Sequence, residues 1–146
     1  MKKNFYIHIW LGFVDGEGSI SISSLGSQKQ AIVKITVVNT VESIIQLFQN
    51  EFGGHIRKRV WKNSKWKPCY EWRLSSDKAI TVLEQIRPYL RIKSRQAELC
   101  IQLQELRKNR TCHARWHPEE YLKSKLQIDK LKEECKKLNE RGISNK

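Results

Sequence analysis

Long apolar runs are absent from this chain of 146 residues. No stretch approaches the roughly 20 apolar residues that a membrane-spanning helix needs, so an integral membrane protein is excluded. The segment 5–14 is interrupted by His8 and Gly12 and has no small-residue cleavage site, so we do not expect a signal peptide. Without a secretory signal, the four cysteines are expected to be reduced thiols inside a cell.

Cysteine spacing typical of a zinc ribbon or finger is also missing, because no two of the four cysteines form a CxxC pair. Cys112, His113 and His117 are metal-capable side chains that lie close together in the sequence. They lack a fourth partner at any standard spacing, which argues against a zinc site.

Acidic residues are scarce: Lys and Arg number 28 and Asp and Glu number 15, which gives a net charge of +13 and a pI near 9.8. This excess predicts a polyanionic partner, nucleic acid first and an anionic membrane surface second. The first 41 residues hold only two carboxylates, Asp15 and Glu17. Two acids so close together in a basic region are candidates for functional carboxylates.

The hydrophobic pattern predicts an α+β protein with an antiparallel sheet, in the order αββαββ followed by helices. Residues 1–110 are expected to form the core and residues 111–146 a helical extension of the same domain. We expect a glycine exit from the second helix at Gly53 and Gly54. The expected helices are 4–16, 41–52, 76–86, 93–108 and 118–140, and the expected strands are 18–25, 31–38, 55–61 and 67–75.

The segment 10–18 contains Gly12 and Gly16, which are four residues apart and stack on one face of a helix. Each glycine costs about 0.8–1 kcal/mol relative to alanine within a helix, so close approach by another helix is the natural reason for two. Glu17 comes where the helix gives way to a strand. In the alternative interpretation Asp15 is an exposed residue at a plain helix end, but a carboxylate there opposes the helix dipole.

This segment resembles the signature of the LAGLIDADG homing endonucleases. Leu11 stands at the usual Ala and Gly16 at the second Ala, while Trp10 replaces the first Leu. Phe13 and Val14 match the second Leu and the Ile, and Glu17 is a conservative replacement of the second Asp. The predicted element order and the basic stretch 91–97 fit the family too, so the resemblance covers about residues 5–108. It implies an αββαββα core whose saddle-shaped, four-stranded sheet binds DNA.

The resemblance further implies the homodimeric branch of the family, because the chain is short and holds a single motif. Leu11, Gly12 and Gly16 would then pack across a two-fold axis that pairs the two copies of Glu17. Glu17 and the Gly16 backbone carbonyl are the expected ligands of Mg²⁺, which suits oxygen donors. Lys93 is the candidate for the basic residue near the scissile phosphate, although Lys93 and its basic neighbours also fit an ordinary solvated basic face. Asn39 stands where the family often carries a Gln that positions water.

Side-chain alternation predicts a polar sheet face opposite the apolar one. A two-stranded ribbon of such a sheet fits the major groove, where Arg, Lys, Gln and Glu discriminate base edges. Residues 57–67 hold six basic residues and no acid, a bias that an ordinary wet sheet face does not require. The expected DNA-binding residues are Ser21, Ser23, Gln30, Lys34, Thr36, Arg57, Arg59, Lys62, Lys65, Lys67, Glu71, Arg73, Arg91 and Arg95.

The resemblance implies a metal-dependent endonuclease that makes a double-strand break in double-stranded DNA at a long, nearly palindromic site, in the service of intron homing. Two alternatives on the same fold are an RNA maturase that assists splicing and a DNA-binding regulator without catalysis. Glu17 and Lys93 favour the nuclease, because assistance in splicing does not need them. Lys exceeds Arg by 18 to 10, which points to an AT-rich genome. We expect an intracellular protein of an organelle (chloroplast or mitochondrion) or of the prokaryotic cytoplasm.

Overall fold

A computed structural model of the chain describes residues 3–26, 30–63, 65–109 and 116–140. Helix α1 (Lys3–Glu17) leads into strands β1 (Gly18–Leu25) and β2 (Gln30–Asn39). Helix α2 (Glu42–Phe52) is followed by β3 (His55–Arg59) and β4 (Cys69–Ser75). Helix α3 (Ser76–Ile86), a short 3₁₀ turn η1 (Arg87–Tyr89), α4 (Ser94–Lys108) and α5 (Pro118–Asn139) complete the chain. The α+β class, the element order and the four antiparallel strands are therefore confirmed.

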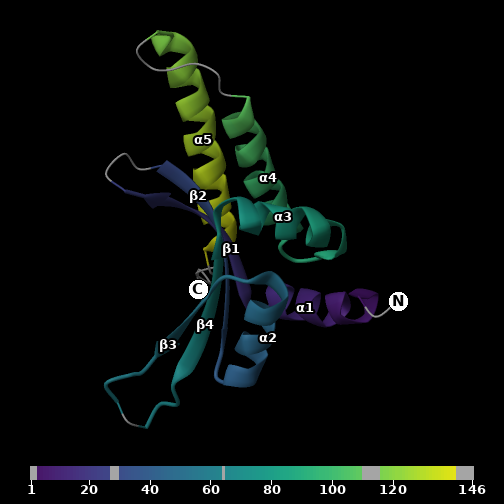
Figure 1. The fold of residues 1–146 in the computed structure, drawn as a ribbon. Coiled ribbons are helices and arrows are strands. Elements are labelled where there is room, and N and C mark those ends of the chain that lie inside the picture. Colours follow the sequence, from purple (N-terminus) through teal and green to yellow (C-terminus); the bar gives the residue numbers. More distant parts are fainter. Residues whose placement is uncertain (1–2, 27–29, 64, 110–115, 141–146) are drawn as a thin grey trace, which may run out of the picture.

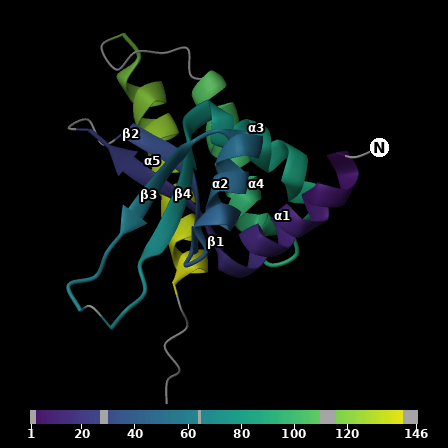
Figure 2. The ribbon, with the colours of Figure 1, turned by 60° about the horizontal axis from the view of Figure 1, so that its bottom comes forward.

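The four strands form one sheet in the order β1-β2-β4-β3, so β1 and β3 are its edges. Helices α1, α2, α3 and α4 lie on the same side of this sheet in two views related by a 60° turn (Figures 1 and 2). Helix α5 packs against the edge strand β1, where Asn139 Nδ2 donates to the Ile20 carbonyl at 2.8 Å. The helices thus leave the opposite sheet face available.

The core forms between the sheet and the helices through alternating strand residues. Ile20 pairs with Ile35 and Val37 pairs with Trp72, and all four side chains are buried, as the alternation predicted. Trp72 also donates its indole N–H to the Gly53 carbonyl at 2.7 Å. This apolar layer fixes which side chains point to the opposite face.

The glycine exit from α2 is confirmed by positive φ angles of 73° at Gly53 and 90° at Gly54. A Cβ on Gly54 would lie 2.5 Å from the Arg73 carbonyl oxygen, so the close approach of the chain to β4 also requires glycine here.

The hairpin between β3 and β4 differs from the prediction. Strand β3 ends at Arg59 and β4 begins at Cys69, so both strands are two residues shorter than expected. Pro68 has no N–H to donate to the ladder, which explains the later start of β4. Val60 continues the alternation of Ile56, which packs against the core, yet Val60 is 73% exposed. No helix in the described part of the chain is long and apolar enough to cross a membrane.

Candidate active site and DNA-binding face

Glu17 occupies the junction where α1 ends and β1 begins. A Cβ on the next residue, Gly18, would lie 2.6 Å from the Val14 carbonyl oxygen, so only glycine lets the strand leave the helix so abruptly. The residue Glu17 is exposed. The turn therefore presents a solvent-accessible carboxylate at the C-terminal end of α1.

Asn39, at the end of β2, reaches this carboxylate. Its Oδ1 accepts a hydrogen bond from the Val41 N–H at 2.8 Å, which fixes the orientation of the amide. The Nδ2 group then donates to Glu17 Oε2 at 3.3 Å. The structure thus brings together two of the predicted catalytic residues, which lie 22 positions apart in the sequence.

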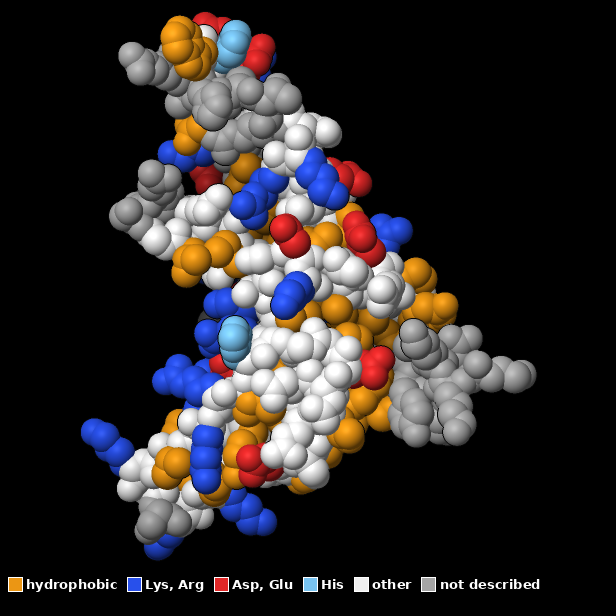
Figure 3. Space-filling view, viewed as in Figure 1, with side chains coloured by type: hydrophobic (Ala, Val, Ile, Leu, Met, Phe, Trp, Pro, Cys, Tyr) orange, Lys and Arg blue, Asp and Glu red, His pale blue; other side chains and the backbone are white. Residues whose placement is uncertain are grey.

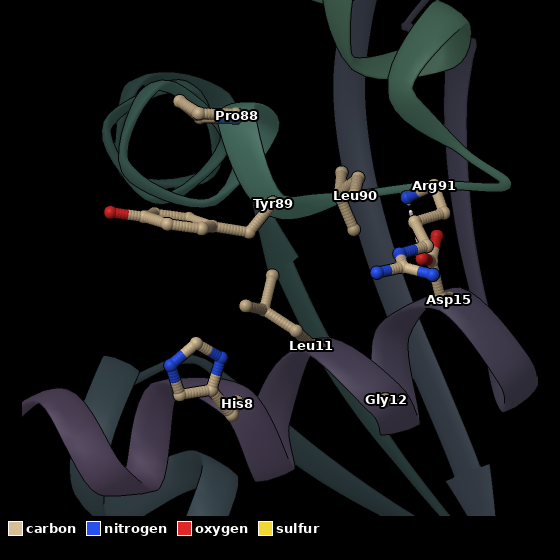
Figure 4. A pocket seen from close by; sticks show the side chains of 8 residues that line it. All are labelled: His8, Leu11, Gly12, Asp15, Pro88, Tyr89, Leu90 and Arg91. Carbon is tan, nitrogen blue, oxygen red and sulfur yellow. Dashed lines mark hydrogen bonds between the residues drawn. The ribbon is translucent and has the colours of Figure 1, made fainter.

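Asp15 ties the same helix end to the segment before α4. Its Oδ2 accepts from the Arg91 N–H at 2.8 Å, and its Oδ1 accepts from the Ile92 and Lys93 N–H groups at 3.2 and 3.0 Å. Figure 4 shows Asp15 and Arg91 side by side at one end of a hollow that Leu11 and Tyr89 also line. The sequence drew attention to Asp15 as one of two acids in a basic region, but it did not reveal these partners.

Lys93 closes the cluster, because its Nζ donates to the backbone carbonyl of Asp15. Burial lowers the pKa of Lys93 below its usual value, and the negative charge of Asp15 opposes that shift. The ammonium therefore lies at the end of α1, two residues before Glu17. All three predicted catalytic residues, which come from three distant segments, therefore lie at this helix end.

The outer face of α1 is open around its two glycines. Gly12 and Gly16 are exposed, and a Cβ on either would have no atom within 4 Å. Ile9, one turn before Gly12, is 45% exposed. Leu11, which we expected at the dimer interface, is instead 6% exposed and packs in the core of the protomer. The open face is thus formed by Ile9 and the glycines.

The sheet face away from the core carries the predicted polar set. The register places Thr36 beside Arg73, and both alternate with buried neighbours on their strands. Arg57 lies beside Glu71 on the edge strand β3, none of whose residues is buried. Figure 3 shows Lys and Arg side chains gathered at the lower left, over β3, β4 and their connection. Ser21, Ser23, Gln30 and Lys34 lie on this same face, and Lys62, Lys65 and Lys67 are exposed between β3 and β4.

Glu71 differs from the expectation of a carboxylate presented to DNA. It is only 3% exposed, and its two oxygens form ion pairs with Nη2 of Arg59 and Nη2 of Arg73. Arg57 lies directly opposite Glu71 in the register but makes no ion pair with any residue that the structure describes. The three arginines of the face therefore fall into one pair held by Glu71 and one without an ionic partner.

The other two predicted basic contacts lie before and within α4. Arg91 is exposed and held through its backbone by Asp15. The Arg95 guanidinium bonds Glu134 of α5 at 2.7 Å and Glu98 at 3.3 Å, and its hydrogen bond to Glu134 is the main cause that raises the pKa of Arg95. Arg95 thus links α4 to α5 in this structure.

Metal-capable side chains elsewhere do not gather into a site. Among the described residues, no three His, Cys, Asp or Glu side chains come close enough to hold an ion. Cys112 and His113 lie outside the described residues, and His117 precedes α5. The three described cysteines, Cys69, Cys100 and Cys135, are buried free thiols.

Comparison with known proteins places the chain among DNA-cleaving enzymes. Residues 10–99 match the sequence profile of the LAGLIDADG endonucleases. A comparison with curated protein sequences finds no match. The solved structure of the homing endonuclease I-CvuI with its target superposes with a TM-score of 0.69 at 25% identity, over 95% of this chain and 85% of that one.

Two further structures share the fold. The archaeal intron-encoded homing endonuclease I-Vdi141I, complexed with DNA, gives a TM-score of 0.74 at 18% identity, over 99% of this chain and 90% of that one. The meganuclease I-AabMI, bound to uncleaved DNA, gives 0.62 at 16% identity, over 86% of this chain but 43% of that one. With its profile match over well more than half of its length, the chain belongs to the LAGLIDADG endonuclease family.

Proposed function

We propose that this protein is a site-specific DNA endonuclease that makes a double-strand break at a long, nearly palindromic target. The observation that carries the proposal is the meeting of Glu17, Asn39 and Lys93 at the end of α1. A polar, strongly basic sheet face on the same chain supplies a surface for DNA. The family match and the DNA complexes of I-CvuI and I-Vdi141I support the same conclusion.

Cleavage of both strands is expected to require two copies of the chain. Among the described residues, one protomer places one exposed carboxylate, that of Glu17, at the end of α1. A two-fold axis through the face of Gly12 and Gly16 would bring a second copy of Glu17 close. Without a Cβ, the two α1 helices can approach closely. We therefore propose a homodimer whose interface contains Ile9, Gly12 and Gly16.

The donor set at this helix end fits a hard divalent cation, for which we propose Mg²⁺. Glu17 keeps unshared acceptor capacity beside the hydrogen bond that it accepts from Asn39. The final carbonyl groups of a helix, such as that of Gly16, have no partner within the helix. Glu17 and Gly16 would hold the ion. A bound Mg²⁺ supplies an activated water and stabilises the charge of a leaving 3′ oxygen.

Of the remaining residues of the cluster, Lys93 would contact the substrate, whereas Asn39 and Asp15 would position other residues. Lys93 would neutralise charge that develops on the scissile phosphate. Asn39 orients the Glu17 carboxylate through its fixed amide. Asp15 is proposed as a positioning residue, because its three N–H acceptor contacts hold the backbone from which Lys93 projects.

On the sheet face we propose a division between base contacts and phosphate contacts. Arginines on a paired ribbon have the shape for bidentate contact with guanine, whereas lysines of the β3–β4 connection suit the phosphate backbone. Ser21, Ser23, Gln30, Lys34 and Thr36 would extend the same contact surface over β1 and β2. Arg91 would add phosphate contact near the active site, and Arg95 would do so only after release from Glu98 and Glu134.

The biological role that we propose is homing of the intron that carries the coding sequence, in an organelle or a prokaryote. The experiment is incubation with a plasmid that carries the intron-less allele of the host gene, with and without Mg²⁺. A double-strand break that needs the cation supports the nuclease. Tight binding without a break would favour a DNA-binding regulator, and stimulation of intron splicing without a break would favour a maturase.

A further inference from the structure

We propose that Glu71 determines base preference by holding Arg59 and Arg73 as one rigid pair, without contacting a base itself. The inference rests on the proposed function and concerns how the sheet face selects its target. It assigns Glu71 the role of a positioning residue and makes the two arginines a single recognition unit.

Burial is the first reason. Glu71 is 3% exposed within a face that is otherwise open, so its carboxylate cannot enter a groove of DNA. A buried carboxylate without partners is costly, and here each oxygen has an arginine. The negative charge of Glu71 is therefore neutralised by Arg59 and Arg73 within the protein.

The geometry of the pairs is the second reason. Arg73 lies two residues beyond Glu71 on β4, and Arg59 lies across on β3 at a diagonal position. Each arginine binds Glu71 through Nη2, and no residue that the structure describes pairs with Nη1 of either guanidinium group, which leaves both Nη1 groups for an outside acceptor. Both arginine side chains are about two-fifths exposed, at 42% and 40%. The carboxylate thus fixes two donors at a set separation while both still reach the surface.

The exposed part of Arg73 is the third reason. Its Nε is buried and has no hydrogen-bond partner within the described part of the chain, so this atom is shielded from DNA. The side chain is nevertheless 40% exposed, and its outer guanidinium N–H groups lie on a face where DNA supplies acceptors, namely guanine O6 and N7 in the major groove. Preorganisation by Glu71 removes side-chain entropy that binding would otherwise cost.

Arg57 supplies an internal control. It lies on the same face, directly opposite Glu71, but it makes no ion pair with the described residues. If Glu71 acts by positioning, a change at residue 71 alters the base positions read by Arg59 and Arg73 together. The position that Arg57 contacts keeps its preference.

The test uses the full-length protein and a randomised DNA library, bound without divalent cation at two salt concentrations. Arg57→Ala, Arg59→Ala and Arg73→Ala first map one base position each. Glu71→Gln keeps the side-chain shape but removes the charge, and Glu71→Asp keeps the charge but shortens the reach. Glu84→Gln is the matched control, since Glu84 is exposed on α3 and the substitution removes the same single negative charge as Glu71→Gln.

We expect Glu71→Gln to reduce discrimination about fivefold or more at both the Arg59 and the Arg73 positions, which is the low end of what one bidentate contact supplies. Glu71→Asp is expected to weaken both preferences without a change in the salt dependence. Thermal unfolding of each variant separates this effect from loss of the fold, and Glu71→Asp carries the test if Glu71→Gln does not fold.

Three results would overturn the inference. Loss of preference at a single new position would make Glu71 a base contact. Unchanged base preferences together with tighter binding, the result expected for Glu84→Gln, would show that Glu71 affects DNA binding only through its charge. Equal loss at the Arg57 position would indicate a general disturbance of the sheet. Failure of the proposed function is distinguishable, because the wild-type protein itself would then select no sequence.

Discussion

Replacement of Asp15 by Asn tests how the active site is held together. Asp15 accepts three backbone N–H bonds from residues 91–93. Asn keeps one acceptor oxygen, loses the charge and turns an NH₂ group toward an N–H donor. A hydrogen bond to a charged group contributes about 1.5–3 kcal/mol, and Asp15 is half-buried, so water replaces part of the loss. We expect the free energy of unfolding to fall by about 1–2 kcal/mol for Asn and by about 3 kcal/mol for Ala.

The assay separates stability, DNA binding and catalysis. Urea denaturation gives the free energy of unfolding, and single-turnover cleavage at saturating protein gives the chemical rate. We expect affinity to change less than about threefold while the cleavage rate falls about tenfold or more, since Lys93 loses its fixed backbone. Asp129→Asn is the matched control, because Asp129 is exposed on α5. A cleavage rate equal to that of the wild type, with the expected loss of stability, would refute the positioning role.

Three further predictions concern the fold, the ammonium and the DNA face. Gly54→Ala should lower the free energy of unfolding by more than about 1 kcal/mol, because φ is 90° and a Cβ would meet the Arg73 backbone. Gly12→Ala, by contrast, should leave the protomer folded but shift the sedimentation coefficient toward that of a monomer. NMR titration of the Lys93 side chain should give a pKa below the ordinary lysine value of 10.5, so the cleavage rate should fall as pH rises through that pKa. Between that pKa and 10.5 the unfolded chain binds more protons than the folded chain, so the free energy of unfolding should rise with pH there. Library binding should show loss of one base preference for Arg57→Ala but a uniform loss of affinity for Lys65→Ala; the same pattern for both variants would contradict the assignment.

The strands were predictable because their signal is local. Alternation of Ile20 and Ile22 with serines fixed which face is buried, and Gly53-Gly54 fixed the end of α2. The strand ends at the β3–β4 connection were less predictable, because Val60 continues the pattern although the ladder has already ended there.

The sequence allowed us to predict which residues belong to the catalytic cluster, but not how they contact one another. Glu17 stood out as a rare acid, and Lys93 and Asn39 came from the family resemblance. The contacts of Asp15 span 76–78 positions and run to backbone N–H groups, which carry no sequence signal of their own. The ion pairs of Glu71 were hidden for a similar reason: Arg57 is its direct neighbour in the register, yet Arg59 and Arg73 are the residues that it binds.

We propose that Glu17 at the end of α1 is required for DNA cleavage, whereas the sheet face binds the DNA. The most direct measurement compares the wild-type protein with Glu17→Gln on a target plasmid with Mg²⁺, with cleaved ends mapped by sequencing and binding measured in parallel. We predict that the wild type breaks both strands at one site, and that Glu17→Gln binds the same site with similar affinity and leaves it intact. Cleavage by Glu17→Gln at the wild-type rate, or loss of binding together with loss of the fold, would contradict the account.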